Sequence, residues 1–282
     1  MKTIKKAFVA LGMAAAAMTP VVAAPSAMAA SSFGPQRSYT MATQPTTTVL
    51  NSITDNNKGG ANNAKAIGDE RYFVRIIGAD GALEKDMTIE PGKRYNVYIF
   101  FRNDSSDTNS FATGTKMSVS IPQTIKKGET GDLRATITSD NALLKSIWAT
   151  AGLTASDNMK LYYKLDSNNT DAPDAMLWNQ YNNTSGIAMP TSLFTSAGAL
   201  LGMSSPLEGS VRGGDNNAGS VTFTLMTEAW DGSSTPSSTP ATGPTEVLIG
   251  IASVLAVGGG AGAWFMTRRS ATKALRQAKG RK

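Results

Sequence analysis

Short segments rich in β-branched and aromatic residues recur between residues 70 and 226, and clusters of Gly, Pro, Asn and Asp separate them. The clearest segment is Arg94 to Arg102, which follows a Pro-Gly turn and carries an apolar residue at every odd position from 95 to 101. Such alternation buries one face of a strand. The pattern predicts an all-β fold, an antiparallel β-sandwich. The other predicted strands are Arg71 to Ile77, Met87 to Glu90, Lys116 to Ile121, Leu133 to Thr138, Met159 to Leu165 and Ser220 to Met226.

The predicted sandwich extends from residue 66 to residue 231, with strands arranged in an Ig-like style. Short helices fit only Asn141 to Trp148 and Thr191 to Leu201. The chain contains no cysteine, so a packed core must stabilise it without disulfides, which about 165 residues allow. Residues 30 to 65 are rich in Thr, Ser, Asn and Gly without a sustained period, and we expect a mobile arm there.

The first 29 residues have the organisation of a secretory signal peptide. Three lysines near the start precede an uncharged stretch rich in Ala, Val, Leu and Met, which ends in Ala27-Met28-Ala29. Small residues at Ala27 and Ala29 suit cleavage by a signal peptidase, so the predicted cut follows Ala29. The rest of the chain would then be exported.

The C-terminal part has the organisation of a membrane anchor. Residues 247 to 266 form an uncharged run of 20 residues, and a helix rising about 1.5 Å per residue would then cross the roughly 30 Å hydrocarbon core of a bilayer. The tail, residues 267 to 282, carries seven Lys and Arg and no acid, which predicts a cytoplasmic location. A Ser, Thr and Pro-rich spacer, residues 232 to 246, precedes the run. We therefore expect a domain on the extracellular face of the envelope, followed by a single transmembrane helix.

The basic overall charge of +6 belongs to these targeting segments. Removing three cations in the signal and seven in the tail from the total of 27 leaves 17, against 20 acids in residues 30 to 245, so this part carries about −3. A negative domain gives no support to nucleic-acid binding.

The chain also contains no histidine. Without histidine or cysteine, Ser-His-Asp and Cys-His catalysis and thiolate or imidazole zinc sites are excluded for this chain acting alone. A hydrolase could still use two carboxylates, but no feature of the sequence selects a pair. We expect a protein that is not an enzyme and has no cofactor, with calcium as the one candidate.

Charged and acidic clusters offer two kinds of site. Asp69, Glu70, Arg71 and Arg75 lie at a strand entrance and are predicted to form solvent-facing ion pairs that fix a turn. Calcium needs six to eight oxygen ligands, and two turns rich in Asp, Asn and Ser could supply them, although neither has EF-hand spacing. The candidate calcium ligands are Asp104, Asp107, Asp166 and Asp171.

Aromatic residues offer a third kind of site, because rings can stack on sugars while core packing explains them equally well. The candidates for a sugar-binding face are Trp148, Trp178, Trp230, Tyr162, Tyr163 and Tyr181. Among them, Trp178 and Tyr181 are predicted to lie in a loop and are the favoured pair.

Four segments resemble a family of uncharacterised bacterial surface β-sandwich domains, related to cell-surface repeats of unknown function. They are residues 68 to 75, residues 91 to 99, the pair Leu200-Leu201-Gly202 and Leu207-Glu208-Gly209, and residues 219 to 223. The resemblance covers most of residues 66 to 228 and implies the fold, without implying a ligand.

The C-terminal segment is similar to the wall-sorting signals of Gram-positive bacteria, with their LPXTG motif, apolar span and basic tail. The corresponding motif here is Thr239-Pro240-Ala241-Thr242-Gly243, with Thr239 in place of the usual leucine. The similarity implies covalent attachment to peptidoglycan, and a retained membrane helix is the alternative. The expected role is structural or adhesive, toward another cell surface or a glycan, and a glycan- or calcium-dependent binding module is the second hypothesis.

Overall fold

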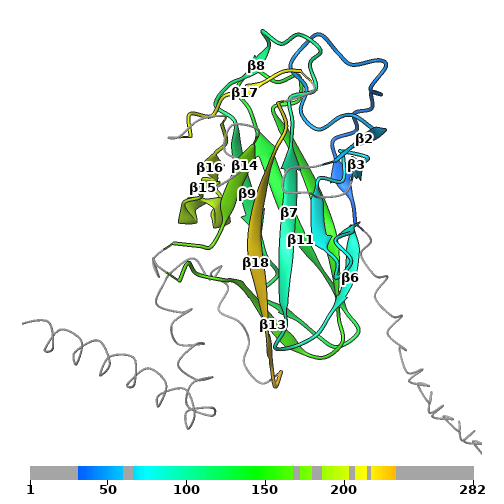
Figure 1. Ribbon diagram of the computed structural model, residues 1–282. Helices are drawn as coiled ribbons and strands as arrows, with labels where there is room; N and C mark the ends of the chain where they lie inside the picture. Colours follow the sequence, from blue (N-terminus) through cyan, green and yellow to red (C-terminus); the bar gives the residue numbers. More distant parts are fainter. Residues whose placement is uncertain are drawn as a thin grey trace, which may run out of the picture.

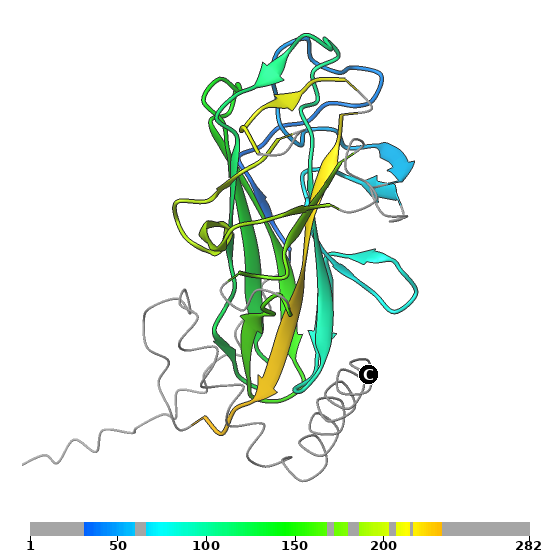
Figure 2. The same ribbon diagram turned by 60° about the vertical axis from the view of Figure 1, so that its left-hand side comes forward.

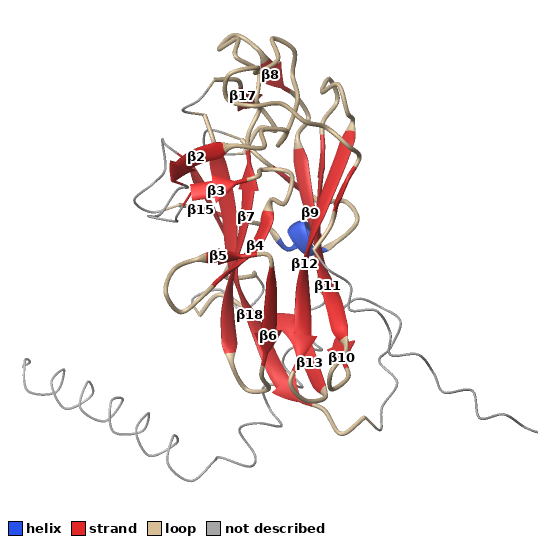
Figure 3. Cartoon of the chain, turned by 90° about the vertical axis from the view of Figure 1, so that its right-hand side faces the viewer, coloured by secondary structure: helices blue, strands red, loops and turns tan. Residues whose placement is uncertain are grey.

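The computed structural model describes residues 31–59, 66–167, 172–179, 186–202, 207–214 and 217–232. Two sheets pack face to face and enclose the core (Figure 1), and Figure 3 shows the two layers side by side. The seven predicted strands each overlap an observed strand. The prediction of an all-β fold with antiparallel sheets, consistent with a β-sandwich, is confirmed.

The first sheet has the strand order β1-β12-β11-β9-β16, with β6 beside β12. Only β6 runs parallel to its neighbour among the described pairs of this sheet. Its strands are β1 (Phe33–Gly34), β6 (Asp86–Ile89), β9 (Lys116–Ser120), β11 (Thr130–Thr138), β12 (Ser146–Ala155) and β16 (Ala199–Leu200).

The second sheet has the order β10-β13-β18-β7-β4-β5, and β14 pairs with both β18 and β15. Its strands are β4 (Val74–Ile77), β5 (Leu83–Glu84), β7 (Arg94–Phe101), β10 (Thr124–Ile125), β13 (Met159–Tyr163), β14 (Met176–Asn179), β15 (Ile187–Ala188) and β18 (Gly219–Ala229). Two small ribbons lie outside the sheets, β8 (Phe111–Ala112) with β17 (Val211–Arg212), and β2 (Asn56–Gly59) with β3 (Ala66–Gly68).

Alternating side chains of the central strands form the core. In the second sheet Val97 pairs with Phe223 and Ile99 with Val221, and these four side chains are buried. They belong to one hydrophobic cluster with inward residues of the first sheet, which include Leu133, Ala135, Ile137, Ile147, Ala149, Ala151 and Leu153. The period-2 alternation seen in the sequence is therefore the pattern that fills the space between the sheets.

Strand β12 is the longest described strand that sequence patterns missed. The sequence predicted a helix over Asn141 to Trp148, but β12 begins at Ser146 and pairs with β11 over nine residue pairs. Its Ala and Gly residues have weak strand propensity by themselves, so the pairing of this strand with β11, β1 and β6 decides its conformation. The helix expected over Thr191 to Leu201 is also wrong, since a single 3₁₀ turn, η1 (Thr191–Phe194), is followed by β16.

The described part of the predicted mobile arm packs against the sandwich. Val49, Leu50 and Ile53 are buried, the N–H of Asp104 donates to the Val49 carbonyl at 2.7 Å, and β1 pairs with β12. In Figures 1 and 2 this blue segment lies at the end of the sandwich that also carries β8 and β17. The arm prediction is wrong for residues 31 to 59. Val49, Leu50 and Ile53 are buried there, and because this part of the chain is mostly loop, its buried residues show no regular spacing in the sequence.

The predicted transmembrane helix, residues 247 to 266, lies outside the described residues. Across the part of the chain that the structure describes, no helix is long and apolar enough to cross a membrane.

The small residues of β12 give the first prediction. Ala151 is fully buried in the cluster between the sheets, so Ala151→Leu should overpack this cluster and lower the free energy of unfolding by about 1–3 kcal/mol. Urea unfolding of the purified protein measures the change. Ala229→Leu, at the exposed end of β18, is the control and should change stability by less than about 0.5 kcal/mol. An equal, small effect of both changes would contradict tight packing around β12.

Candidate functional site

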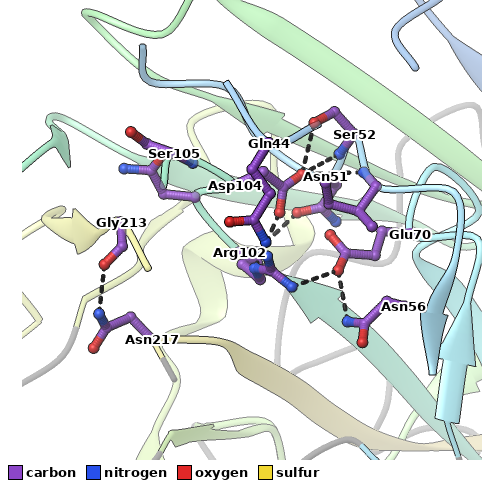
Figure 4. Close-up of polar contacts among 12 residues, drawn as sticks. Gln44, Asn51, Ser52, Asn56, Glu70, Arg102, Asp104, Ser105, Gly213 and Asn217 are labelled. Carbon is purple, nitrogen blue, oxygen red and sulfur yellow. Dashed lines mark hydrogen bonds and ion pairs between the residues drawn. The ribbon is translucent and has the colours of Figure 1, made fainter. Parts of the chain in front are cut away.

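A buried ion-pair network lies where β7 ends (Figure 4). Arg102 directly follows β7 and is 1% exposed. Its Nη1 donates to Oε1 of Glu70 at 3.0 Å, and its Nε lies 3.2 Å from Oδ1 of Asp104. Both carboxylates are fully buried. One guanidinium therefore contacts two buried carboxylates, and these need further hydrogen-bond donors because a buried polar group without a partner is costly.

Those donors come from the N-terminal segment. Oδ2 of Asp104 accepts hydrogen bonds from the backbone N–H and the hydroxyl of Ser52 and from the N–H of Ile53. Oε1 of Glu70 also accepts one from Nδ2 of Asn56 at 2.6 Å. The network thus connects residues 52 to 56 with β7 through side chains that are all buried.

The side chain of Asn51 adds to this connection by making the hydrogen bonds to the backbone of β7 and Arg102 that a paired strand would make. Its Nδ2 donates to the Phe100 carbonyl and its Oδ1 accepts from the N–H of Arg102, both at 2.9 Å. Its φ of 46° lies in the left-handed region, which asparagine tolerates better than most residues. Arg37 adds a second attachment, since its Nε donates to the carbonyls of Leu50 and Asn51.

The electrostatics of the network raise the pKa of Glu70 well above its ordinary value of 4.5. Burial is the largest cause, repulsion by Asp104 is the second, and the attraction of Arg102 opposes both. Burial also lowers the pKa of Arg37 to about 10. Because its charged atoms face the interior, this network is suited to holding two segments together rather than to contacting a ligand.

A pocket of about 550 Å³ lies beside β9, where the first sheet meets β13 and η1. Its apolar lining comes from Val119, Ile121, Leu161 and Phe194. Its polar and aromatic lining comes from Ser118, Ser120, Gln123, Arg134, Thr136, Tyr162, Tyr163, Thr195 and Ser196. The volume falls within the range of roughly 300–1,000 Å³ that is typical of small-molecule sites.

Aromatic contacts fix the inner wall of this pocket. The rings of Tyr163 and Phe194 are stacked at 4.0 Å, and Phe194 meets the ring of Phe223 edge-on at 5.1 Å. Burial raises the pKa of Tyr163, so its phenol stays neutral in the physiological range. Outside the wall, the guanidinium of Arg134 lies 4.4 Å from the ring centre of Trp148.

The structure divides the predicted charged turn into two parts. Arg71 and Asp69 form a partly exposed ion pair at 2.6 Å, as expected. Glu70 and Arg75 are buried instead, so the prediction that they face solvent is wrong. Sequence reasoning placed Glu70 and Asp104 in separate surface features, and Arg102, which it used only as the end of a strand, brings them together.

The two turns that were predicted to supply calcium ligands are described to different extents. Asp104 points inward to Arg102, whereas Asp107 lies in an exposed turn and accepts from the N–H of Asn109. Asp166 follows β13, and Asp171 lies outside the described residues. Among the described residues, no group of three or more Asp or Glu could hold a metal ion.

The favoured glycan pair is tested only in part. Trp178 lies in strand β14 and not in a loop, and its Nε1 donates to the hydroxyl of Thr222 at 2.8 Å. Tyr181 lies outside the described residues, as do the signal residues Ala27 and Ala29. The same holds for the sorting motif Thr239, Pro240, Ala241, Thr242 and Gly243. Of the aromatic candidates, Tyr162 and Tyr163 line the pocket.

Comparisons with known proteins find no relative. No protein-family model, no curated protein and no solved structure matches this chain. The resemblances to surface sandwich domains and to wall-sorting signals therefore stay predictions from the sequence.

Removing the central guanidinium should destabilise the protein strongly. Arg102→Met leaves two buried carboxylates without their cation, and we expect a loss of about 3–5 kcal/mol in the free energy of unfolding. Urea unfolding at pH 7 measures it, with Arg94→Met on the exposed start of β7 as the matched control. A loss below about 1 kcal/mol would show that the pairs do not hold the segment.

The raised pKa of Glu70 predicts a pH dependence. Between pH 4.5 and the raised pKa the folded state binds more protons than the unfolded state, so this residue's contribution to stability is present below pH 4.5 and is lost as the pH rises. Glu70→Gln mimics the protonated form and should shrink the difference in melting temperature between pH 5 and pH 8. The control is Glu84→Gln, on the exposed end of β5. The same pH dependence in Glu70→Gln as in the wild type would contradict the assignment.

Proposed function

We propose that this protein is a secreted, envelope-anchored bacterial surface protein with a non-catalytic, structural or adhesive role. The observation that carries the proposal is the order of features along the chain. A signal-like N-terminus, an all-β domain, a Ser/Thr/Pro spacer, a 20-residue apolar run and a basic tail occur in succession. Each of them fits export followed by retention at the envelope.

The stability of the β domain supports this role. The domain has no disulfide to rely on, because the chain has no cysteine. Instead, the buried network of Arg102, Glu70 and Asp104 holds the N-terminal segment on the end of the sandwich. A surface protein that is anchored at one end needs the rest of its domain to keep its fold outside the cell, and such a network of buried hydrogen bonds and ion pairs suits this need.

The spacer limits how far the domain stands from its anchor. The 15 residues of the spacer, 232 to 246, span about 50 Å when fully extended at roughly 3.3 Å per residue. We therefore propose a sandwich close to the envelope, which contacts another cell surface, a glycan or copies of itself from that position.

Ligand binding is the second candidate function, and the pocket beside β9 is the observation that favours it. Its size and its mixture of apolar, aromatic and hydroxyl lining are those of a small-molecule site. Of the two ligands considered from the sequence, a glycan fits this lining better than calcium, since the described lining residues include no carboxylate.

Two forms of anchoring follow from the C-terminal sequence. A sortase-type enzyme would attack the carbonyl of Thr242, release the chain from Gly243 onward and join the new carboxyl to a wall amine. Thr239 opposes this route, because an apolar groove that expects leucine loses about 1.5–3 kcal/mol, roughly 10-fold to 150-fold in specificity. A retained membrane helix is the form that we favour.

Mass spectrometry of the mature protein tests the proposal. We expect a chain that starts after Ala29 and retains Lys282 in the detergent-soluble membrane fraction. A chain that ends at Thr242 and is linked to peptidoglycan would establish sorting and leave the surface location intact. Recovery of the protein from the cytosol with Met1 still present would refute both forms of anchoring and the proposed function.

A further inference from the structure

We propose that the pocket beside β9 binds an oligosaccharide with a carboxylate group, and that Arg134 holds this carboxylate. The inference deepens the proposed function and rests on it, since it names the ligand class of an adhesive surface. It adds a binding site that the aromatic pattern of the sequence did not locate.

The charge of the pocket selects the ligand. Among the described residues that line it, Arg134 is the one with a formal charge at neutral pH, and it lies on the exposed face of β11. A cationic ligand would find no carboxylate partner in this lining. A guanidinium presents a planar set of donors that matches a carboxylate in a two-pronged hydrogen bond, so an anionic group fits this position best.

The position of Arg134 is restricted before any ligand arrives. Its guanidinium lies 4.4 Å from the ring centre of Trp148, on the neighbouring strand β12. Contact with the aromatic face stabilises the cation and reduces the freedom that binding would otherwise remove. Trp148 is thus a positioning residue in this site. The proposal does not require Trp148 to stack on the sugar, which is the role that the sequence predicted.

The hydroxyls beside Arg134 suit a sugar. Ser120 is the direct cross-strand partner of Arg134, and Ser118 is the partner of Thr136, so these side chains form one row across β9 and β11. A hydroxyl both donates and accepts, which matches the hydroxyls of a saccharide in either direction. Thr195 and Ser196 add two more hydroxyls from the segment after η1.

The wall on the inner side of β9 is apolar and rigid. Val119, Leu161 and Phe194 supply it, and the stacking of Phe194 on Tyr163 fixes its shape. Val119 alternates with Ser118 and Ser120 along β9, so the polar row and the apolar wall lie on opposite faces of this strand. The described strand β16 pairs with β9 only at Lys116 and Met117, so a saccharide can lie along the edge of β9 beyond them, with its hydroxyls toward the polar row and the C–H face of a ring toward the apolar wall. A small inorganic anion would leave that wall exposed to water.

The test uses the purified full-length chain in detergent, immobilised for binding measurements. The probes are oligogalacturonate, sialyllactose and a hyaluronan tetrasaccharide as acidic saccharides, lactose and chitotriose as neutral ones, and an acidic peptide of similar charge. We expect saturable binding of at least one acidic saccharide, with the neutral saccharides and the peptide at least about tenfold weaker.

Two variants of Arg134 assign the site. Arg134→Gln should weaken binding of the acidic saccharide at least about tenfold, and Arg134→Lys should recover only part of it, because the charge returns without the planar fork. Lys116→Gln removes an exposed cation from the neighbouring strand β9, outside the pocket lining, and should leave the Kd unchanged. Unchanged melting temperatures would confirm that the variants are folded.

Several results would overturn the inference: binding of none of the acidic saccharides, equal binding of neutral saccharides, tighter binding of the peptide, or an unchanged Kd in Arg134→Gln. These outcomes leave the proposed location untouched, because the mature termini and the membrane fraction decide that separately. Conversely, a cytosolic chain that still bound an acidic saccharide through Arg134 would remove the proposed function and keep the site.

Discussion

The attachment of the N-terminal segment to the sandwich depends on one buried guanidinium. Arg102 lies between Glu70 and Asp104, and one oxygen of each carboxylate, Oε1 of Glu70 and Oδ2 of Asp104, accepts hydrogen bonds from residues 52 to 56. An ion pair buried in this way is weak evidence for net stability, since desolvation offsets much of the attraction. Its effect here is on specificity, because a different path of the N-terminal segment would leave buried charges without partners.

Two parts of the sandwich have different chemistry. At the end with β8 and β17, the polar groups face inward and are used in holding the N-terminal segment. Beside β9, hydroxyls and Arg134 line a pocket, and the guanidinium of Arg134 lies over the ring of Trp148 on β12. A rigid frame with one closed polar network and one open polar pocket is an arrangement that suits recognition, in which the frame fixes the geometry of the pocket.

Local sequence patterns predicted the strands in which apolar and polar side chains alternate. They failed for segments whose conformation is decided by contacts with neighbouring segments. The segment 94 to 101 alternates between apolar and polar residues, and it forms β7 as expected. The segment 146 to 155 contains small residues that fit a strand or a helix, and only pairing on both sides makes it β12. The same reasoning explains the error in the N-terminal segment, where Leu50 and Ile53 are buried without any period.

The sequence by itself determined that the chain has no disulfide, no thiol or imidazole chemistry and an all-β core, because residue types and period-2 alternation settle these properties. Tertiary structure alone decided which charges are buried, since Glu70, Arg102 and Asp104 look like surface residues until three segments converge on them. It also decided where a ligand could bind. Arg134 and Phe194 lie 60 residues apart in the chain, and packing of η1 beside β9 brings them to one pocket.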